Sequence, residues 1–364
     1  MDPATGSQIA LCSAASPSDV SRAITQVLSS FPTSSTRALT SPPRAHSVAQ
    51  ETFDSGIWSR MAPADRASVM SSIARLLATR VAELAVLESL QTGRPLREMR
   101  TQLGRLAPLT VLELARITKE AGLPDGVLSV LPGFGAITGK ALVEDPRIKK
   151  VDLTGGTAGG RVVAGIAGSN LASVTAELGG KAPILIFANV NLALAVNGVA
   201  FASFIASGQT CVAGTRILIQ RPILEEFTAL LREKANGIER RIGSPFNEGS
   251  MMGPVISAKQ LAIVEELVEA AQKDGVEVIC GGKRMQGKSS LDGHDLSGGF
   301  FYPPTILVDG PSTKITSTRI WKEEAFGPVI VLVPFDTEEE AGYSRFQEKS
   351  NRRLPAFAGD PPGQ

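Results

Sequence analysis

Residues 173–220, SVTAELGGKAPILIFANVNLALAVNGVAFASFIASGQTCVAGTRILIQ, decide the fold class. Short apolar segments at 173–178, 183–187 and 216–220 have the length and composition that are typical of strands. Residues 192–206 form a longer apolar segment, which predicts a helix. Strands that alternate with helices indicate a mostly parallel sheet with helices on both faces. The predicted fold class is therefore α/β.

The same alternation continues on either side of this stretch. Upstream, a strand is predicted at 148–153, a glycine-rich turn at 155–160 and a helix at 161–169. Downstream, the pattern predicts an amphipathic helix and two more strands, at 257–274, 276–279 and 329–335.

The two ends of the chain have a different character. Helices are predicted at 62–92 and 110–121, and a strand or hairpin segment at 126–131. Residues 26–46 are rich in Ser, Thr and Pro, which predicts a disordered insertion. Residues 342–364 are polar and aperiodic, which predicts a disordered tail.

Composition excludes several classes of function. The chain has 364 residues and a net charge of +1, so no broad basic surface would attract nucleic acid. The three cysteines, Cys12, Cys211 and Cys280, are far apart, and the histidines are His46 and His294. This set predicts neither a disulfide framework nor a metal site. No apolar run approaches the ~20 residues that span a bilayer, and no signal pattern opens the sequence. We expect a cytoplasmic protein without a membrane segment.

Cys211 is the first candidate for catalysis. It follows the predicted apolar helix and lies between Gly208 and Gly214, which allow a substrate to approach the backbone closely. A thiol in such a loop can act as a nucleophile. The alternative is a buried, inert cysteine, which is what most isolated cysteines are.

Glu177 is the second candidate. Its carboxylate lies at the end of an apolar strand, beside a glycine pair, where a base could abstract a proton. Taken alone, a salt bridge to Lys181 is the simpler interpretation.

Two further segments could hold a cofactor. The turn at 155–160 joins a strand to a helix, and its backbone N–H groups could cradle a phosphate, although it does not match G-x-G-x-x-G. Glu324, just before Phe326 and a Gly-Pro turn, could bind ribose hydroxyls, with a solvated turn as the alternative.

Taken together and in this order, the four segments resemble the motifs of the aldehyde dehydrogenase superfamily. AELGGKAP resembles its glutamate motif, FIASGQTCVAG its cysteine motif, LTGGTAGG its cofactor loop, and EEAFGPV its late cofactor motif. The resemblance implies an aldehyde dehydrogenase-like α/β fold, with a Rossmann-like cofactor domain at 1–179 and an α/β catalytic domain at 180–341. It also implies a small aldehyde substrate and an NAD cofactor, with NADP as the alternative.

The resemblance assigns a role to each candidate residue. Cys211 would attack the aldehyde carbonyl and offer its N–H to the oxyanion, and Glu177 would activate water for thioester hydrolysis. Gly155 and Gly156 would line the path of the pyrophosphate. Leu178 and Gly179 would lie near the nicotinamide, and Glu324 and Phe326 would hold its ribose. The cofactor-binding set is Gly155, Gly156, Thr157, Ala158, Gly159, Gly160, Leu178, Gly179, Glu324 and Phe326.

The sequence departs from the family pattern near residue 106. One block of the family pattern is missing there. It would carry the oxyanion asparagine, the ribose-binding lysine, two strands and the acid that discriminates NAD from NADP. The family's oligomerisation flap is absent as well, so both domains are expected to be incomplete although family members usually form homo-oligomers. The sequence therefore also allows an inactive relic or a cofactor-independent thiol esterase.

Overall fold

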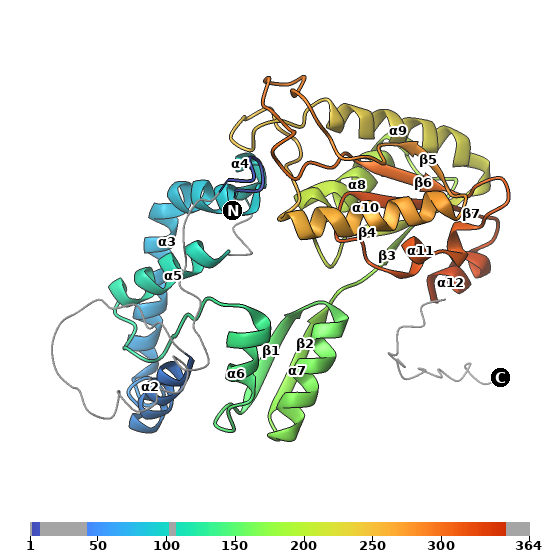
Figure 1. Ribbon diagram of the computed structural model, residues 1–364. Coiled ribbons are helices and arrows are strands. Elements are labelled where there is room, and N and C mark those ends of the chain that lie inside the picture. Colours follow the sequence, from blue (N-terminus) through green and yellow to red (C-terminus); the bar gives the residue numbers. More distant parts are fainter. Residues whose placement is uncertain (1, 8–41, 102–106, 347–364) are drawn as a thin grey trace, which may run out of the picture.

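The computed structural model describes residues 2–7, 42–101 and 107–346 (Figure 1). Within these residues the chain forms a five-stranded sheet, a separate two-stranded sheet and a group of N-terminal helices. The architecture is α/β, as predicted.

The five-stranded sheet forms the centre of the second half of the chain. Its strand order is β3-β4-β7-β6-β5, and all neighbours are parallel except β5, which is antiparallel to β6. The strands are β3 (Ala182–Ile186), β4 (Gly214–Gln220), β5 (Glu277–Cys280), β6 (Thr305–Val308) and β7 (Val329–Phe335).

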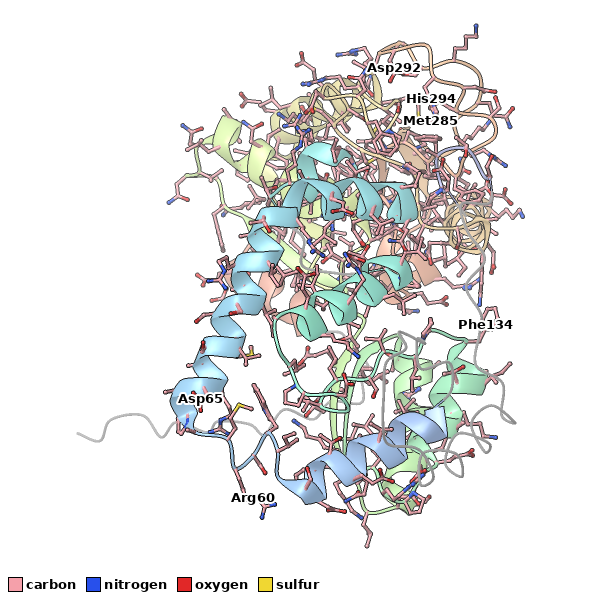
Figure 2. All side chains as sticks on the ribbon, turned by 90° about the vertical axis from the view of Figure 1, so that its left-hand side faces the viewer. Arg60, Asp65, Phe134, Met285, Asp292 and His294 are labelled. Carbon is pink, nitrogen blue, oxygen red and sulfur yellow. The ribbon has the colours of Figure 1, made fainter. Side chains whose placement is uncertain are left out.

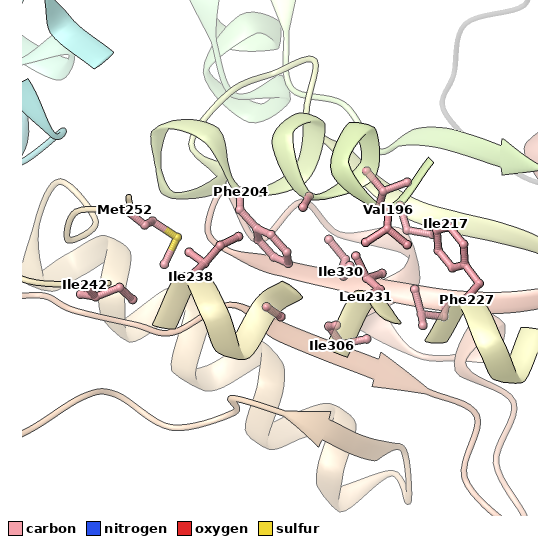
Figure 3. Packing of buried hydrophobic residues seen from close by; sticks show 14 of the residues in the cluster. Val196, Phe204, Ile217, Phe227, Leu231, Ile238, Ile242, Met252, Ile306 and Ile330 are labelled. Carbon is pink, nitrogen blue, oxygen red and sulfur yellow. The ribbon is translucent and has the colours of Figure 1, made fainter. Parts of the chain in front are cut away.

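Helices cover both faces of this sheet. They are α8 (Leu192–Phe204), α9 (Leu224–Glu239), α10 (Ala258–Lys273) and α11 (Arg319–Lys322). Along β7, Ile330 and Leu332 pack with α8 and α9, whereas Val331 and Val333 pack with α10 and α11. Figure 3 shows the first of these clusters, with Ile330 among Phe204, Leu231 and other apolar side chains. The unbroken apolar run of β7 follows from this burial on both faces.

The two-stranded sheet is much less covered. β1 (Lys150–Gly155) and β2 (Ser173–Leu178) pair in parallel through the crossover helix α7 (Thr157–Ser169). Along each strand exposed residues alternate with half-buried ones, and α7 packs on the sheet. Since a helix lies against only one face, the other face presents polar side chains such as Asp152 and Thr175 to solvent.

The N-terminal helices lie beside the two sheets (Figure 1). They are α2 (Pro42–Ser55), α3 (Pro63–Thr92), α4 (Leu96–Met99) and α5 (Pro108–Glu120), followed by the short η2 (Gly135–Gly139) and α6 (Lys140–Val143). Figure 2 shows Arg60 and Asp65 at the joint between α2 and α3, at the end of the molecule opposite Asp292 and His294. The remaining elements are η3 (Ile205–Gly208), η4 (Arg221–Ile223), η5 (Ile315–Ser317) and α12 (Glu338–Phe346).

The buried Glu88 carboxylate of α3 fixes the start of α5. It accepts hydrogen bonds from the Ala107 N–H, at 3.1 Å, and from the Thr110 hydroxyl, at 2.6 Å. The Gln91 side chain accepts a bond from the Leu109 N–H at 2.7 Å. No side chain of α5 itself caps this helix, so α3 supplies the acceptors that its first turn needs.

Residues 2–7 pack against the second half of the chain. The Phe300 N–H donates to the Pro3 carbonyl at 2.9 Å, and Ala4 belongs to the hydrophobic cluster that contains Phe301. This N-terminal segment therefore contacts residues that lie far from it in the sequence and pack on the five-stranded sheet.

Three expectations need correction. Residues 126–131 form no strand, because a strand needs a hydrogen-bonding neighbour and no described strand lies beside this segment. Residues 42–46, expected to be disordered, begin α2, and residues 342–346, placed in the tail, belong to α12. The rest of the expected insertion (26–41) and tail (347–364) lies outside the described residues.

Candidate active site

Cys211 lies in the loop between α8 and β4, and the backbone before it is unusual. Ala206, Ser207 and Gly208 all adopt left-handed conformations, with φ of 53°, 56° and 70°. Only glycine takes this conformation without strain, so the turn has to be held by contacts around it. The Cys211 side chain is partly buried.

Contacts on several sides hold this nucleophile loop, which comprises residues 205–211. The Ser207 hydroxyl donates to the Gly253 carbonyl at 2.7 Å, and the Gln209 side chain accepts a bond from the Ile256 N–H at 2.9 Å. A Cβ atom on Gly208 would lie 2.1 Å from the Gly327 carbonyl oxygen, so the two backbones touch there. The loop therefore packs directly on the turn that precedes β7.

The connection between the two sheets lies against the same loop. A Cβ atom on Gly180 would lie 2.9 Å from the Cys211 carbonyl oxygen, so a side chain at this position would crowd the cysteine. The glycine pair Gly179–Gly180 is thus explained by close approach of the backbone.

Lys181, the next residue, is buried. Its ammonium donates to the Ile320 carbonyl at 2.8 Å. Burial is the main cause that lowers the pKa of Lys181 to about 7; the charge of Arg216 lowers it further, and Glu324 opposes both. The Arg216 guanidinium stacks on Trp321, with 5.1 Å between its carbon and the ring centroid. The alternative that the sequence allowed, a salt bridge between Lys181 and Glu177, is therefore wrong.

Glu324 contacts the glycine pair directly. A Cβ atom on Gly179 would lie 2.0 Å from Oε2 of Glu324, so the carboxylate lies against this glycine. Burial raises the pKa of Glu324, while the backbone N–H of Gly180 and the charge of Lys181 oppose that rise. Phe326, with a left-handed φ of 47°, is held through its carbonyl, which accepts a bond from the Gln260 amide at 3.1 Å.

The glycine-rich turn leads from β1 into α7. Gly156 begins the helix without a side-chain cap, and residues 155–159 are exposed. A Cβ atom on Gly156 or Gly159 would meet nothing within 4 Å, so the space in front of the helix is open. Gly160 is buried and packs on Leu178, which ties the turn to β2 and hence to Gly179.

Glu177 stands apart from this group. Its side chain is exposed on β2, opposite Thr154 in the strand ladder. Within the described residues, its carboxylate has no hydrogen bond or ion pair. The structure thus joins the turn at 155–160, Leu178, Gly179, Glu324 and Cys211 through successive contacts, whereas the Glu177 side chain is exposed to solvent.

The structure also brings residues to this site that the sequence did not indicate as functional, namely Arg216, Gln260 and Trp321. For Lys181 the sequence did carry a signal. This lysine begins the apolar run KAPILIF, and burial of its charge together with that run costs free energy.

The described parts of the chain lack two kinds of feature. No three His, Cys, Asp or Glu side chains are grouped so that they could bind a metal ion. None of the described helices has the length and apolar character needed to cross a membrane.

Comparison with known proteins identifies relatives over most of the chain. The sequence model of the aldehyde dehydrogenase family matches residues 1–107 and 104–345. Betaine aldehyde dehydrogenase of Amaranthus hypochondriacus, described as chloroplastic, is 40% identical over 236 residues, which are 65% of this chain and 44% of the relative. The chain thus spans just under half the length of this relative. The Cereibacter sphaeroides betaine aldehyde dehydrogenase is 31% identical over 355 residues, covering 78% of this chain and 70% of the relative.

Solved structures agree with this assignment. HpcC from Thermus thermophilus superposes with a TM-score of 0.83 at 29% identity, covering 96% of this chain and 75% of that one. Betaine aldehyde dehydrogenase of Staphylococcus aureus in complex with NAD+ gives 0.81 at 25% identity, covering 95% and 76%. From its sequence motifs, its fold and these matches, the chain belongs to the aldehyde dehydrogenase family.

Proposed function

We propose that this chain oxidises a small aldehyde to a carboxylic acid, with Cys211 as nucleophile, Glu177 as base and NAD as cofactor. The observation that carries the proposal is the contact of the nucleophile loop with Gly180, beside the carboxylate of Glu324. The connection between β2 and β3 therefore lies beside both groups that the proposed reaction needs: the Cys211 thiol and the Glu324 carboxylate, which would bind the ribose of the cofactor.

The start of α7 suits the cofactor's pyrophosphate. The first N–H groups of a helix have no intrahelical partner and carry partial positive charge, and here no side chain caps them. Gly155, Gly156 and Gly159 leave room for a phosphate to approach the backbone. NAD is preferred to NADP because related solved proteins were crystallised with NAD+. When bound, the cofactor accepts the hydride that leaves the substrate carbon.

The chain's own residues carry the remaining steps. The Cys211 thiolate adds to the carbonyl carbon of the aldehyde. The backbone N–H of Cys211 donates to the former carbonyl oxygen, which becomes negatively charged. Loss of hydride leaves a thioester on Cys211. Glu177 then takes a proton from water, the hydroxide attacks the thioester, and the acid leaves as the thiolate is restored. Since Glu177 is exposed on β2, its side chain has to turn toward Cys211 for this step.

The block absent near residue 106 would lower the rate. It would contain the second oxyanion donor, and the loss of one such donor typically costs ~10²–10³ in rate. We therefore expect slow turnover compared with a complete family member.

A second candidate function is cofactor-independent ester hydrolysis by Cys211. The contrast between the two sheets favours it, because the nucleophile loop lies beside a five-stranded sheet whereas the cofactor side has only two described strands. A relic without activity is the third hypothesis, and the missing oxyanion and ribose groups favour it. Cytoplasmic location is supported by the sequence, because cysteines as few and as far apart as Cys12, Cys211 and Cys280 suit a reducing compartment.

The test is NADH formation with a panel of aliphatic and aromatic aldehydes and betaine aldehyde, the last because relatives carry that name. We expect slow turnover that disappears in Cys211→Ala. Cys280→Ala is the matched control, because Cys280 lies on the edge strand β5 and should leave turnover unchanged. Hydrolysis of an aryl ester without NAD+, lost in Cys211→Ala, would instead support the esterase. Neither activity in a folded chain would support the relic.

A further inference from the structure

The left-handed turn before Cys211 needs contacts that hold it. Ala206 and Ser207 have φ of 53° and 56°, which non-glycine residues keep only when their surroundings determine it. Cys211 follows this turn within a few residues, so relaxation of the turn would move the thiol.

The side-chain amide of Gln209 braces the turn. Its Nε2 donates to the Ala206 carbonyl at 3.2 Å, and the backbone N–H of Gln209 donates to the same carbonyl at 3.0 Å. Its Oε1 accepts a hydrogen bond from the Ile256 N–H at 2.9 Å. The two ends of one amide group therefore connect the strained Ala206 with a residue 47 positions further along the chain.

Ser207 makes a second link to the same segment. Its buried hydroxyl donates to the Gly253 carbonyl at 2.7 Å. Because the hydroxyl is removed from water, no solvent acceptor is at hand to replace this carbonyl. We call residues 253–256 the supporting segment, since both links end on its backbone.

The supporting segment is itself fixed on both sides. The N–H of the buried Val255 donates to the Phe300 carbonyl at 3.0 Å. A Cβ atom on Gly253 would lie 1.9 Å from the carbonyl oxygen of Gly93, the C-cap of α3. Ser257, the next residue, caps α10 with its side chain. The turn before Cys211 is thus tied to backbone that has little freedom to move.

The two links lie on either side of Gly208. The Gly208 backbone touches the Gly327 carbonyl, so three consecutive residues of the loop are held by contacts with distant parts of the chain. Cys211 comes two residues after the last of them. Small displacements of a catalytic group are costly in rate, so the precision of these contacts matters for a nucleophile.

We propose that Ser207 and Gln209 are positioning residues for Cys211, because they hold the left-handed turn on the supporting segment and so set where the thiol lies. This inference rests on the proposed role of Cys211 as nucleophile. Neither side chain takes a step in the reaction; both act through the backbone of the loop.

The test uses three variants of the full chain. Gln209→Met keeps the length of the side chain and removes both of its hydrogen bonds. Gln209→Glu keeps an oxygen acceptor for the Ile256 N–H but loses the donor to the Ala206 carbonyl. Ser207→Ala removes the hydroxyl alone.

The matched controls remove bonds of the same kind elsewhere on the five-stranded sheet. Gln220, at the end of β4 opposite Cys211, accepts from the Ala188 N–H at 2.8 Å through its Oε1. The buried Ser289 hydroxyl donates to the Ile242 carbonyl at 2.5 Å. Gln220→Met and Ser289→Ala therefore report the cost of losing such a bond outside the loop.

Amide hydrogen exchange is followed in residues 204–213 and at Ile256, with α9 as internal reference because Phe227 and Leu231 of α9 lie in the core. In Gln209→Met we expect roughly ten-fold faster exchange at Ile256, whose residue is 39% exposed, so that water reaches the freed N–H. Gln209→Glu should keep the protection of Ile256. Residues 204–213 should exchange faster in Gln209→Met and in Ser207→Ala, with α9 unchanged.

Turnover of aldehyde is measured in parallel. In Gln209→Met and Ser207→Ala, kcat should fall roughly ten-fold or more while KM stays nearly unchanged, because the thiol is misplaced although substrate still binds. The kcat of Gln209→Glu should lie between those of Gln209→Met and the wild type. Gln220→Met and Ser289→Ala should keep the kcat of the wild type.

Exchange in the loop that is no faster than in the two controls would overturn the proposal, as would an equal increase in α9, which would mean general destabilisation. Unchanged kcat in an active Gln209→Met and an active Ser207→Ala would also overturn it. A wild-type chain without turnover would contradict the proposed function alone, since hydrogen exchange still decides whether Ser207 and Gln209 hold the loop.

Discussion

Lys181 makes the stability of the fold depend on pH. Its pKa is about 7 in the folded chain, against an ordinary value of 10.5. Between these values the unfolded chain binds a proton at Lys181 that the folded chain does not, so this lysine should contribute a rise in the free energy of unfolding from pH about 7 to about 10.5. The raised pKa of Cys280, about 11 against 9.0, acts in the opposite direction at the upper end of this range. Below that window both states are charged, and burial of the ammonium costs most. Urea titrations across this range measure the slope.

Lys181→Met is the matched variant, because it keeps the length of the side chain and removes the charge. Arg216 and Glu324, which face Lys181, remain in place. The slope of the free energy of unfolding against pH should be smaller in Lys181→Met than in the wild type. Parallel curves for the two proteins would show that Lys181 is not the group that titrates.

A substitution at Gly208 tests how strongly the left-handed turn constrains the residue type at this position. At φ of +70°, with the Gly327 carbonyl oxygen 2.1 Å from an added Cβ, Gly208→Ala should destabilise the chain by about 1–3 kcal/mol. Gly198 lies inside α8 with open space around it, so Gly198→Ala should stabilise by about 0.5–1 kcal/mol. Thermal unfolding compares the two variants. Shifts of the same sign would contradict the strain ascribed to position 208.

At the scale of elements, α5 depends on a carboxylate that belongs to α3. Glu88→Ala would leave the Ala107 N–H and the buried Thr110 hydroxyl without this acceptor, at a cost of roughly 1–3 kcal/mol for each group. Glu88→Gln retains one acceptor oxygen and should lose less. Denaturation followed by circular dichroism gives both values. If Glu88→Ala were as stable as the wild type, α5 would not depend on α3 for its first turn.

At the scale of the whole molecule, the two sheets should differ in stability. A two-stranded sheet is marginal by itself, and β1–β2 is covered by α7 on one face only. The five-stranded sheet has apolar clusters on both faces. We therefore expect amides of β1 and β2 to exchange through local opening, well before those of β4 and β7. Equal protection of both sheets would mean that the chain unfolds as one unit.

The local pattern of apolar residues alone determined much of the secondary structure of this protein. The apolar runs at 173–178 and 329–335 became β2 and β7 with the same bounds, and the long periodic segment at 62–92 became α3. The reason is that these patterns lie in consecutive residues: β7, buried on both faces, is a continuous apolar run, whereas β2, covered on one face, alternates between half-buried and exposed residues. The order of the motifs likewise sufficed to identify the family.

Tertiary structure decided the features that depend on distant parts of the chain. Lys181 binds the Ile320 carbonyl, 139 residues away, rather than the nearby Glu177. The apolar segment at 126–131 forms no strand, since strand formation requires a neighbour that the described chain does not supply. The Ser207 hydroxyl donates to the Gly253 carbonyl only because folding brings together residues that are 46 positions apart. The sequence determines which faces are apolar, whereas the path of the chain determines which polar groups meet once they are removed from water.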